Sequence, residues 1–279
     1  MRRNGGVDMR ITKILNNNAV VVKNDQQENI AIGAGVGFNK GKNDLVNQEK
    51  IEKLFVLKEH EKLQQLLIRI PEEHFIMTEE VIAYAEDYLQ VELNEHIRLV
   101  LADHLSFAIE REQKGIHLKN KLLQEIKVLY KKEYEIGLWA INHIKEQLNV
   151  AMPVDEAAFI ALHIHTMKVK GGDLHETVRL TAILKDMVQT IERVLNITIQ
   201  EDDISYDRLI THLRFALTRT GEELHTMDEE MLAMIRNKFS HSYECAQIAA
   251  RELSITHGID LPEDELGYIT LHIERLHQN

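Results

Sequence analysis

Two parts of the sequence repeat each other, and this repeat limits the folds open to the chain more than any other feature. The stretch DHLSFAIER (103–111) aligns with THLRFALTR (211–219). The stretch PVDEAAFIALHI (153–164) aligns with PEDELGYITLHI (262–273) at almost the same separation along the chain. Matches in one order at a nearly constant separation predict a duplicated domain rather than an array of many short repeats.

The repeated region has the periodicity of helices. From about residue 65 onward, apolar residues recur at spacings of three and four, with Lys and Glu between them. Only three prolines occur in 279 residues, and a mostly helical chain must be poor in proline because proline breaks helix interiors. The sequence KGGD (170–173) is the clearest internal break. We therefore expect two homologous all-α helical bundles.

The segment before the repeats (1–58) has a different texture, rich in glycine and β-branched residues. The turn NNN (16–18) suits a hairpin because asparagine tolerates left-handed backbone conformations. A glycine-rich loop, GAGVGF, occupies residues 33–38. The runs that we predict to be strands are RITKIL (10–15), AVVVK (19–23), NIAI (29–32) and EKIEKLFVL (49–57). The expected fold is thus multidomain, a small all-β domain followed by two all-α bundles.

Charge is distributed unevenly between these two parts. The chain carries a net charge of −12, but residues 1–58 carry +4 and the remainder carries −16. A small basic domain joined to an acidic body favours a module that binds a polyanion such as a nucleic acid.

Four histidines occupy equivalent places in the two copies. His104 and His212 align with each other, as do His163 and His272, and each belongs to an apolar helical stripe. A single histidine in such a stripe is usually a core residue, whereas packing alone does not explain four at repeated positions. A histidine at the edge of an apolar stripe can bind a metal, transfer protons or carry a phosphoryl group.

The sequence argues against a metal site and against catalysis. The imidazoles of HIH (163–165) would point about 200° apart on a helix and could not chelate one ion. The chain lacks HExxH and paired cysteines, and the order DH (103–104) is the reverse of the HD pair of helical phosphohydrolases. It also lacks GxSxG, P-loop and kinase motifs, and GAGVG (33–37) is not a full dinucleotide motif. We expect no enzyme activity, no metal and no cofactor.

Phosphorylation is then the remaining functional role for the repeated histidines. A phosphoryl group adds up to two negative charges to a neutral imidazole, so buried or interfacial sites must find new partners or separate. An effect on the order of 1–3 kcal/mol shifts a marginal dimer equilibrium. Arg111 and Arg219 lie seven residues after His104 and His212 and could neutralise such a charge.

From Met9 to the C-terminus, these features resemble the BglG/LicT/SacY family of transcriptional antiterminators. The resemblance rests on the β-rich head with NNN and GAGVGF and on the two helical copies with paired histidines. It implies a co-antiterminator (CAT) RNA-binding domain with its linker at 9–63. It also implies two PTS regulation domains (PRDs), named for the sugar phosphotransferase system, at 64–170 and 171–279.

The resemblance implies that the head binds an RNA hairpin, the ribonucleic antiterminator, in a nascent leader transcript. The terminator then cannot form, and transcription continues into sugar-utilisation genes. The head residues at the family's RNA-contact positions are Lys13, Asn16, Asn18, Gly33, Gly35 and Phe38. Lysine can bind phosphate, and asparagine can form hydrogen bonds with base edges. Glycine lets the RNA approach the backbone closely, and phenylalanine can stack on an unpaired base. Ala34 departs from the family, which often has a basic residue there.

The resemblance also places the family's phosphorylatable histidines at His104 and His163 in the first PRD and at His212 and His272 in the second. It implies that a sugar-specific enzyme II phosphorylates the first PRD and inactivates the protein, whereas the phosphocarrier HPr phosphorylates the second PRD and activates it. Dimer geometry would link these signals to RNA binding, so we expect a homodimer.

Two other kinds of protein fit the sequence less well. A DNA-binding activator with the same regulation domains would begin with a helix-turn-helix, whereas residues 10–57 read as strands. A helical metal-dependent phosphohydrolase would hold stoichiometric metal. The single cysteine, Cys245, and the lack of a signal peptide or membrane-length apolar segment favour a cytoplasmic protein without membrane insertion. Met9 could be the natural start of the chain.

Overall fold

The computed structural model describes most of the chain, namely residues 9–24, 27–51, 53–56, 69–168, 173–200, 204–218 and 227–277. The described residues up to His117 form one compact unit together with Ile144–Met152. Leu118–His143 and the described residues from Pro153 onward form a second unit. No helix in the described ranges is long and apolar enough to cross a membrane.

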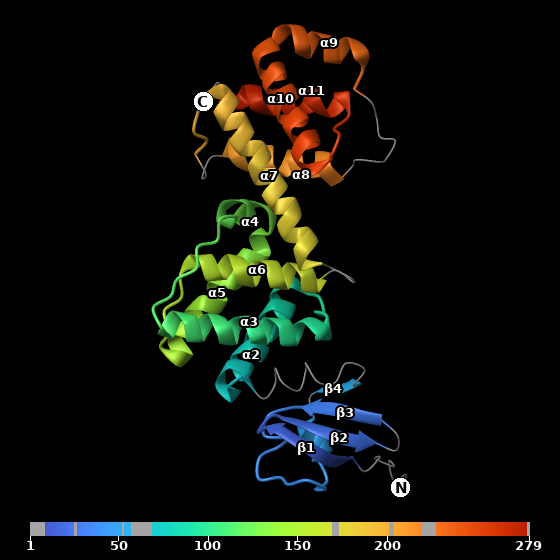
Figure 1. Cartoon of the computed structure of the whole chain (residues 1–279), viewed down its shortest axis with the longest axis vertical. Helices are drawn as coiled ribbons and strands as arrows, with labels where there is room; N and C mark the ends of the chain where they lie inside the picture. The colour runs from blue at the N-terminus through green and yellow to red at the C-terminus, as the bar shows by residue number, and fades with distance from the viewer. Residues whose placement is uncertain are drawn as a thin grey trace. The chain divides into compact units, whose positions relative to one another are not determined.

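The head is an antiparallel sheet in which neighbouring strands follow each other in the sequence (blue in Figure 1). The strands are β1 (Arg10–Asn16), β2 (Ala19–Asn24), β3 (Gln27–Ile32) and β4 (Lys53–Val56). Asn16 pairs with Ala19, so β1 and β2 form a tight hairpin at the predicted turn. The fourth strand begins later than the predicted 49–57, because Gln48–Lys50 forms a 3₁₀ turn, and the last residue of the predicted run, Leu57, lies outside the described residues. The side chain of Asn47 caps that turn by accepting a hydrogen bond from the amide of Glu49.

Both faces of the sheet are covered. Ala19–Val22 of β2 are all apolar, and because successive side chains of a strand point to opposite faces, both faces of β2 are apolar. One face packs under the loop that follows β3 and buries Ile11, Val20, Val22, Ala31, Val36 and Val46. The other face packs against helical residues and buries Leu15, Ala19, Val21, Ile30 and Ile32 with Ile70, Phe75, Leu99 and Ala102.

Two helices complete the first unit, α2 (Glu72–Leu89) and α3 (Glu95–Gln113). Helix α2 begins directly after Pro71 and ends at Gln90, which adopts the left-handed conformation. Arg98 of α3 binds Glu79 and Glu86 of α2 at 2.5 and 3.3 Å. Because Arg98 is only 6% exposed, these ion pairs fix α3 against α2.

The helices of the body form one series that occurs twice. The first copy comprises α2, α3, α4 (Leu123–Leu129), α5 (Lys131–Leu148) and α6 (Val154–Lys168). The second comprises α7 (Leu174–Leu195), α8 (Ile204–Thr218), α9 (Glu229–Lys238), α10 (Ser240–His257) and α11 (Glu263–His277). The predicted small β domain followed by duplicated helical domains is therefore confirmed.

The backbone repeats in detail as well. Tyr130 separates α4 from α5 with φ −126° and ψ 47°, and Phe239 separates α9 from α10 with φ −121° and ψ 46°. Helix α5 is followed by Asn149 with φ 54°, and α10 by Gly258 with φ 68°. Equivalent residues thus stop and start the helices in both copies.

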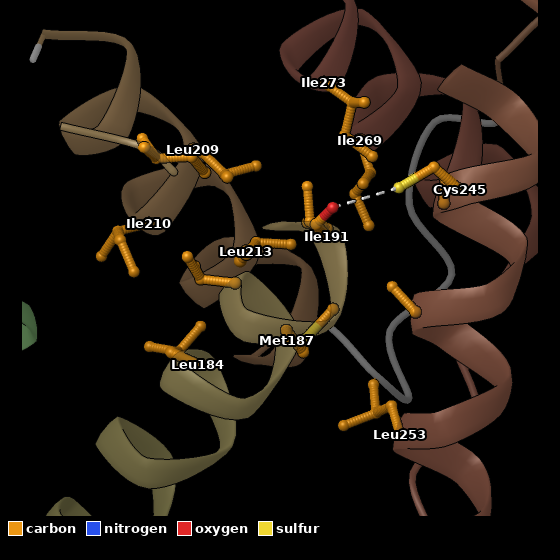
Figure 2. Packing of buried hydrophobic residues seen from close by; sticks show 14 of the residues in the cluster. Leu184, Met187, Ile191, Leu209, Ile210, Leu213, Cys245, Leu253, Ile269 and Ile273 are labelled. Carbon is orange, nitrogen blue, oxygen red and sulfur yellow. Dashed lines mark hydrogen bonds between the residues drawn. The ribbon is translucent and has the colours of Figure 1, made fainter. Parts of the chain in front are cut away.

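The core of the second copy lies between α7, α8, α10 and α11 (Figure 2). Leu184, Leu213 and Ile269 are fully buried there. Cys245 is also fully buried, with its sulfur 4.0 Å from the carbonyl oxygen of Ile191. Burial raises the pKa of Cys245 to about 11, so this thiol is a packing residue rather than a nucleophile.

Candidate functional site

The hairpin turn and the glycine-rich loop of the head are hydrogen-bonded to each other. The amide of Gly35 donates to Asn18 Oδ1 at 2.6 Å, and the amide of Gly33 donates to the carbonyl oxygen of Asn18 at 2.9 Å. Asn16 Oδ1 accepts from the amide of Asn18 at 2.8 Å. Four of the six predicted RNA-contact residues are thus brought together. Asn18 is 3% exposed, so its side chain also holds the loop in shape.

Two glycines are required by the loop for different reasons. Gly35 has φ +65°, a conformation that favours glycine. At Gly37 a Cβ atom would lie 2.5 Å from the carbonyl oxygen of Asn16, so only glycine allows the loop to approach the turn this closely. No role was predicted for Gly37 from the sequence, although it belongs to the same GAGVGF motif.

Side chains that can meet a nucleic acid surround this turn and loop. Phe38 is 58% exposed, which is unusual for phenylalanine, and Lys13 on β1 is also exposed. Lys50 Nζ donates to the carbonyl oxygen of Gly35 at 3.4 Å. Lys50 was not predicted from the sequence, and it supplies a positive charge beside the loop that contains Ala34.

Helix α2 lies beside the same loop within the first unit. Asn17 Nδ2 donates to Glu72 Oε2 at 2.9 Å. A cavity of about 330 Å³ separates Gly33 and Ala34 from the side of α2 that carries Glu79 and Glu80. In this structure the loop therefore faces acidic side chains that would repel a phosphate backbone.

In the second copy the two repeated histidines are in contact. His212 lies on α8 and His272 on α11, and their rings stack with centroids 4.5 Å apart and an interplanar angle of 28°. Tyr268 of α11 lies 5.7 Å from the His212 ring. The fold thus brings together two imidazoles that belong to different repeated motifs of the sequence.

A carboxylate accompanies this pair. Glu265 Oε2 lies 3.7 Å from His212 Nε2, and both side chains are mostly buried. Glu265 precedes His272 by seven residues, which places both on one face of α11. No role was predicted for Glu265 from the sequence. The repeat could have indicated Glu265, because Glu156 precedes His163 by the same seven residues. Glu156 is fully buried in the structure.

The second pair is also flanked by positive charge. Burial lowers the pKa of His272, and the charges of Arg275 and Arg208 lower it further. His272 is therefore kept neutral near pH 7, the form in which a ring nitrogen has a free lone pair for attack on phosphorus.

The first pair is divided between the two compact units. His104 lies on α3 in the first unit and is partly exposed, whereas His163 lies on α6 in the second unit and is 9% exposed. Burial lowers the pKa of His163 to about 4. A charge added to His163 would therefore enter a dry, apolar environment.

His165, the second imidazole of HIH, has its own partners. Its ring lies 4.2 Å from that of Tyr130, and its Nδ1 lies 3.1 Å from Glu133 Oε1. Burial opposes ionisation of Glu133, but hydrogen bonds from His165 and Lys168 lower its pKa to about 2. Within the described ranges, no group of three His, Cys, Asp or Glu side chains could hold a metal ion.

Of the two arginines predicted to neutralise a phosphoryl group, only Arg111 is described. It is 7% exposed, its Nε lies 3.9 Å from Glu112 Oε1, and its guanidinium lies 5.5 Å from the centroid of the Phe107 ring. Arg219 lies outside the described residues.

Comparison with known proteins connects both sites to named families. Residues 9–64 match the CAT RNA binding domain family, and residues 79–167 and 185–276 each match the PRD domain family. The transcription antiterminator LicT of Bacillus subtilis is 36% identical, covering 96% of this chain and 99% of LicT. The beta-glucoside operon antiterminator of Dickeya chrysanthemi is 35% identical, covering 96% of each chain.

The solved structures include a similar protein. The crystal structure of GlcT CAT-PRDI is 34% identical with a TM-score of 0.52, covering 58% of this chain and 99% of that one. The turn and loop of the head thus lie in the CAT match, and all four repeated histidines lie in the two PRD matches. The chain belongs to the BglG/LicT family of transcription antiterminators, which join a CAT RNA-binding domain to PRD domains.

Proposed function

We propose that this chain is a transcriptional antiterminator rather than an enzyme. Its head binds an RNA hairpin in a nascent leader transcript, prevents terminator formation and switches on sugar-utilisation genes. The observation that carries the proposal is the interlocked turn and loop, with Phe38 exposed beside it, in the segment that matches the CAT family. Phe38 would stack on an unpaired base, Asn16 would contact base edges, and Lys13 and Lys50 would contact phosphates.

The domains that we assign are the head with its linker at 9–63 and two regulation domains at 64–170 and 171–279. His104, His163, His212 and His272 are the proposed phosphorylation sites. A sugar-specific enzyme II would modify the first regulation domain and HPr the second, with opposite effects on a cytoplasmic homodimer. Support comes from the burial of His163 and from the stacking of His212 on His272, where added charge changes packing.

RNA binding can be tested without assuming any particular operon. The full chain, incubated with HPr, enzyme I and phosphoenolpyruvate, selects ligands from a random RNA library. We expect selected molecules to share a hairpin with unpaired bases in its stem. Selection of unstructured or double-stranded RNA without such a hairpin would refute the proposed ligand.

Control by phosphorylation is tested by identifying the histidines that carry a phosphoryl group. After incubation with phosphorylated HPr, mass spectrometry under alkaline conditions should find phosphohistidine at His212 or His272. The variant H212A/H272A is the matched control and should lose this label. Labelling confined to other residues would remove the regulatory assignment.

A further inference from the structure

The second histidine pair faces two arginines on the same helices. Arg208 precedes His212 by four residues on α8, and Arg275 follows His272 by three residues on α11. Side chains at these spacings lie on one helical face. Since the two rings stack at 4.5 Å, both guanidiniums lie on the side where α8 meets α11, and both act electrostatically on His272.

The two guanidiniums are available to a new partner. Both side chains are exposed, and within the described ranges neither makes an ion pair with a carboxylate. One carboxylate lies beside the pair, with Glu265 Oε2 3.7 Å from His212 Nε2. The charges that lower the pKa of His272 are those of Arg275 and Arg208, and both attract an anion to this place.

The first copy lacks these arginines. At the equivalent positions of the repeat, Val100 stands in place of Arg208 and Thr166 in place of Arg275. Thr166 is 3% exposed, and its hydroxyl donates to the carbonyl oxygen of His163 at 2.8 Å. The second copy therefore carries two positive charges at positions where the first copy has uncharged side chains.

We propose that Arg208 and Arg275 form a clamp that holds a phosphoryl group on the His212/His272 pair and thereby fastens α8 to α11. The clamp rests on the proposed function, because it requires that this pair be modified. A guanidinium offers several N–H donors to phosphate oxygens, so two of them can bridge one phosphoryl group from two helices. At the equivalent positions of the first copy, the same modification would meet valine and threonine, which offer it no positive charge.

The chemistry of the modification is a simple phosphoryl transfer. A ring nitrogen of the acceptor attacks phosphorus with its lone pair, the N–P bond forms, and the P–N bond to the donor breaks. The acceptor ring loses its N–H proton, and the departing donor nitrogen takes one up. The arginines take no part in these bonds and act only as positioning residues.

The clamp can be tested with the full chain and no protein donor. Potassium phosphoramidate phosphorylates histidine with ammonia as the leaving group, and mass spectrometry gives the extent at each ring. Hydrogen exchange of the α8 and α11 amides is then compared before and after modification. The variants are R208Q/R275Q and, as a control, R251Q, which removes an exposed arginine of α10. All three replaced side chains are exposed, so circular dichroism should be unchanged.

In the wild type and R251Q, we expect phosphorylation to slow exchange in α8 and α11 by about tenfold. This protection should weaken at high salt and be absent in R208Q/R275Q modified to the same extent. Equal protection in R208Q/R275Q would overturn the clamp, and so would failure of phosphoramidate to modify either ring. Protection with phosphoramidate but no labelling by phosphorylated HPr would refute the proposed donor and leave the clamp standing.

Discussion

Replacing Phe38 with alanine should separate RNA affinity from folding stability. Full burial of a phenylalanine side chain is worth about 1.5–3 kcal/mol, and Phe38 is 58% exposed. The truncation should therefore cost only about 0.6–1.3 kcal/mol of stability. Stacking of one base on an aromatic ring contributes about 1–3 kcal/mol to binding. The expected loss of affinity is therefore about 5- to 150-fold.

Asn18→Ala provides the contrast. Its Oδ1 accepts the amide hydrogen bond of Gly35 at 2.6 Å from a buried position. Removing the acceptor leaves that amide without its partner, at a cost of about 1–3 kcal/mol. This variant should lose thermal stability and RNA affinity together, whereas Phe38→Ala should lose mainly affinity.

The assay is fluorescence anisotropy with a labelled hairpin from the selection, alongside thermal unfolding of the same samples. Leu45→Ala is the matched control, because Leu45 is another exposed apolar side chain of the head, at 44%. It should bind RNA as the wild type does. Wild-type affinity in Phe38→Ala, or an equal loss in Leu45→Ala, would refute the stacking role.

Other predictions concern the helical copies. Burial lowers the pKa of His163 to about 4, from 6.5 in the unfolded chain. Between these pH values the unfolded chain binds one more proton than the folded chain. The free energy of unfolding should therefore fall by up to about 3 kcal/mol as the pH drops from 6.5 to 4. Thermal midpoints should fall less in His163→Gln, and equal slopes would contradict this. Gly137→Ala should destabilise by about 1–3 kcal/mol in urea unfolding, since its Cβ would collide with the carbonyl oxygen of Ala157, and an unchanged midpoint would count against this packing. Cys245 should resist a thiol reagent until the chain unfolds, and rapid labelling of native protein would contradict its burial. Glu265→Gln should alter the tautomer of His212 seen by ¹⁵N NMR; an unchanged tautomer would mean that Glu265 does not orient the ring.

The sequence was sufficient to predict structure where the pattern that marks an element lies within that element. The β-rich runs RITKIL and AVVVK and the asparagines between them predicted the hairpin. The repeat predicted that His212 and His272 occupy helices equivalent to those of His104 and His163. The extent of β4 was predicted wrongly, because EKIEKLFVL alternates throughout while Asn47 caps a 3₁₀ turn at its start.

The rest depends on packing between distant segments. Lys50 reaches Gly35 from beyond the end of the glycine-rich loop, and Glu265 of α11 reaches His212 of α8. No local pattern marks either contact. Arg208 and Arg275 are ordinary surface arginines in the sequence, and they gain meaning only because the rings of His212 and His272 stack.

The most direct measurement is single-round transcription through a terminator whose leader carries the selected hairpin. The full chain should give more readthrough after modification by phosphorylated HPr than before it, and H212A/H272A should show no such increase. Phe38→Ala should give little readthrough in either state. Readthrough that is the same with and without phosphorylation, and the same in H212A/H272A, would contradict control of the RNA-binding head by the second histidine pair.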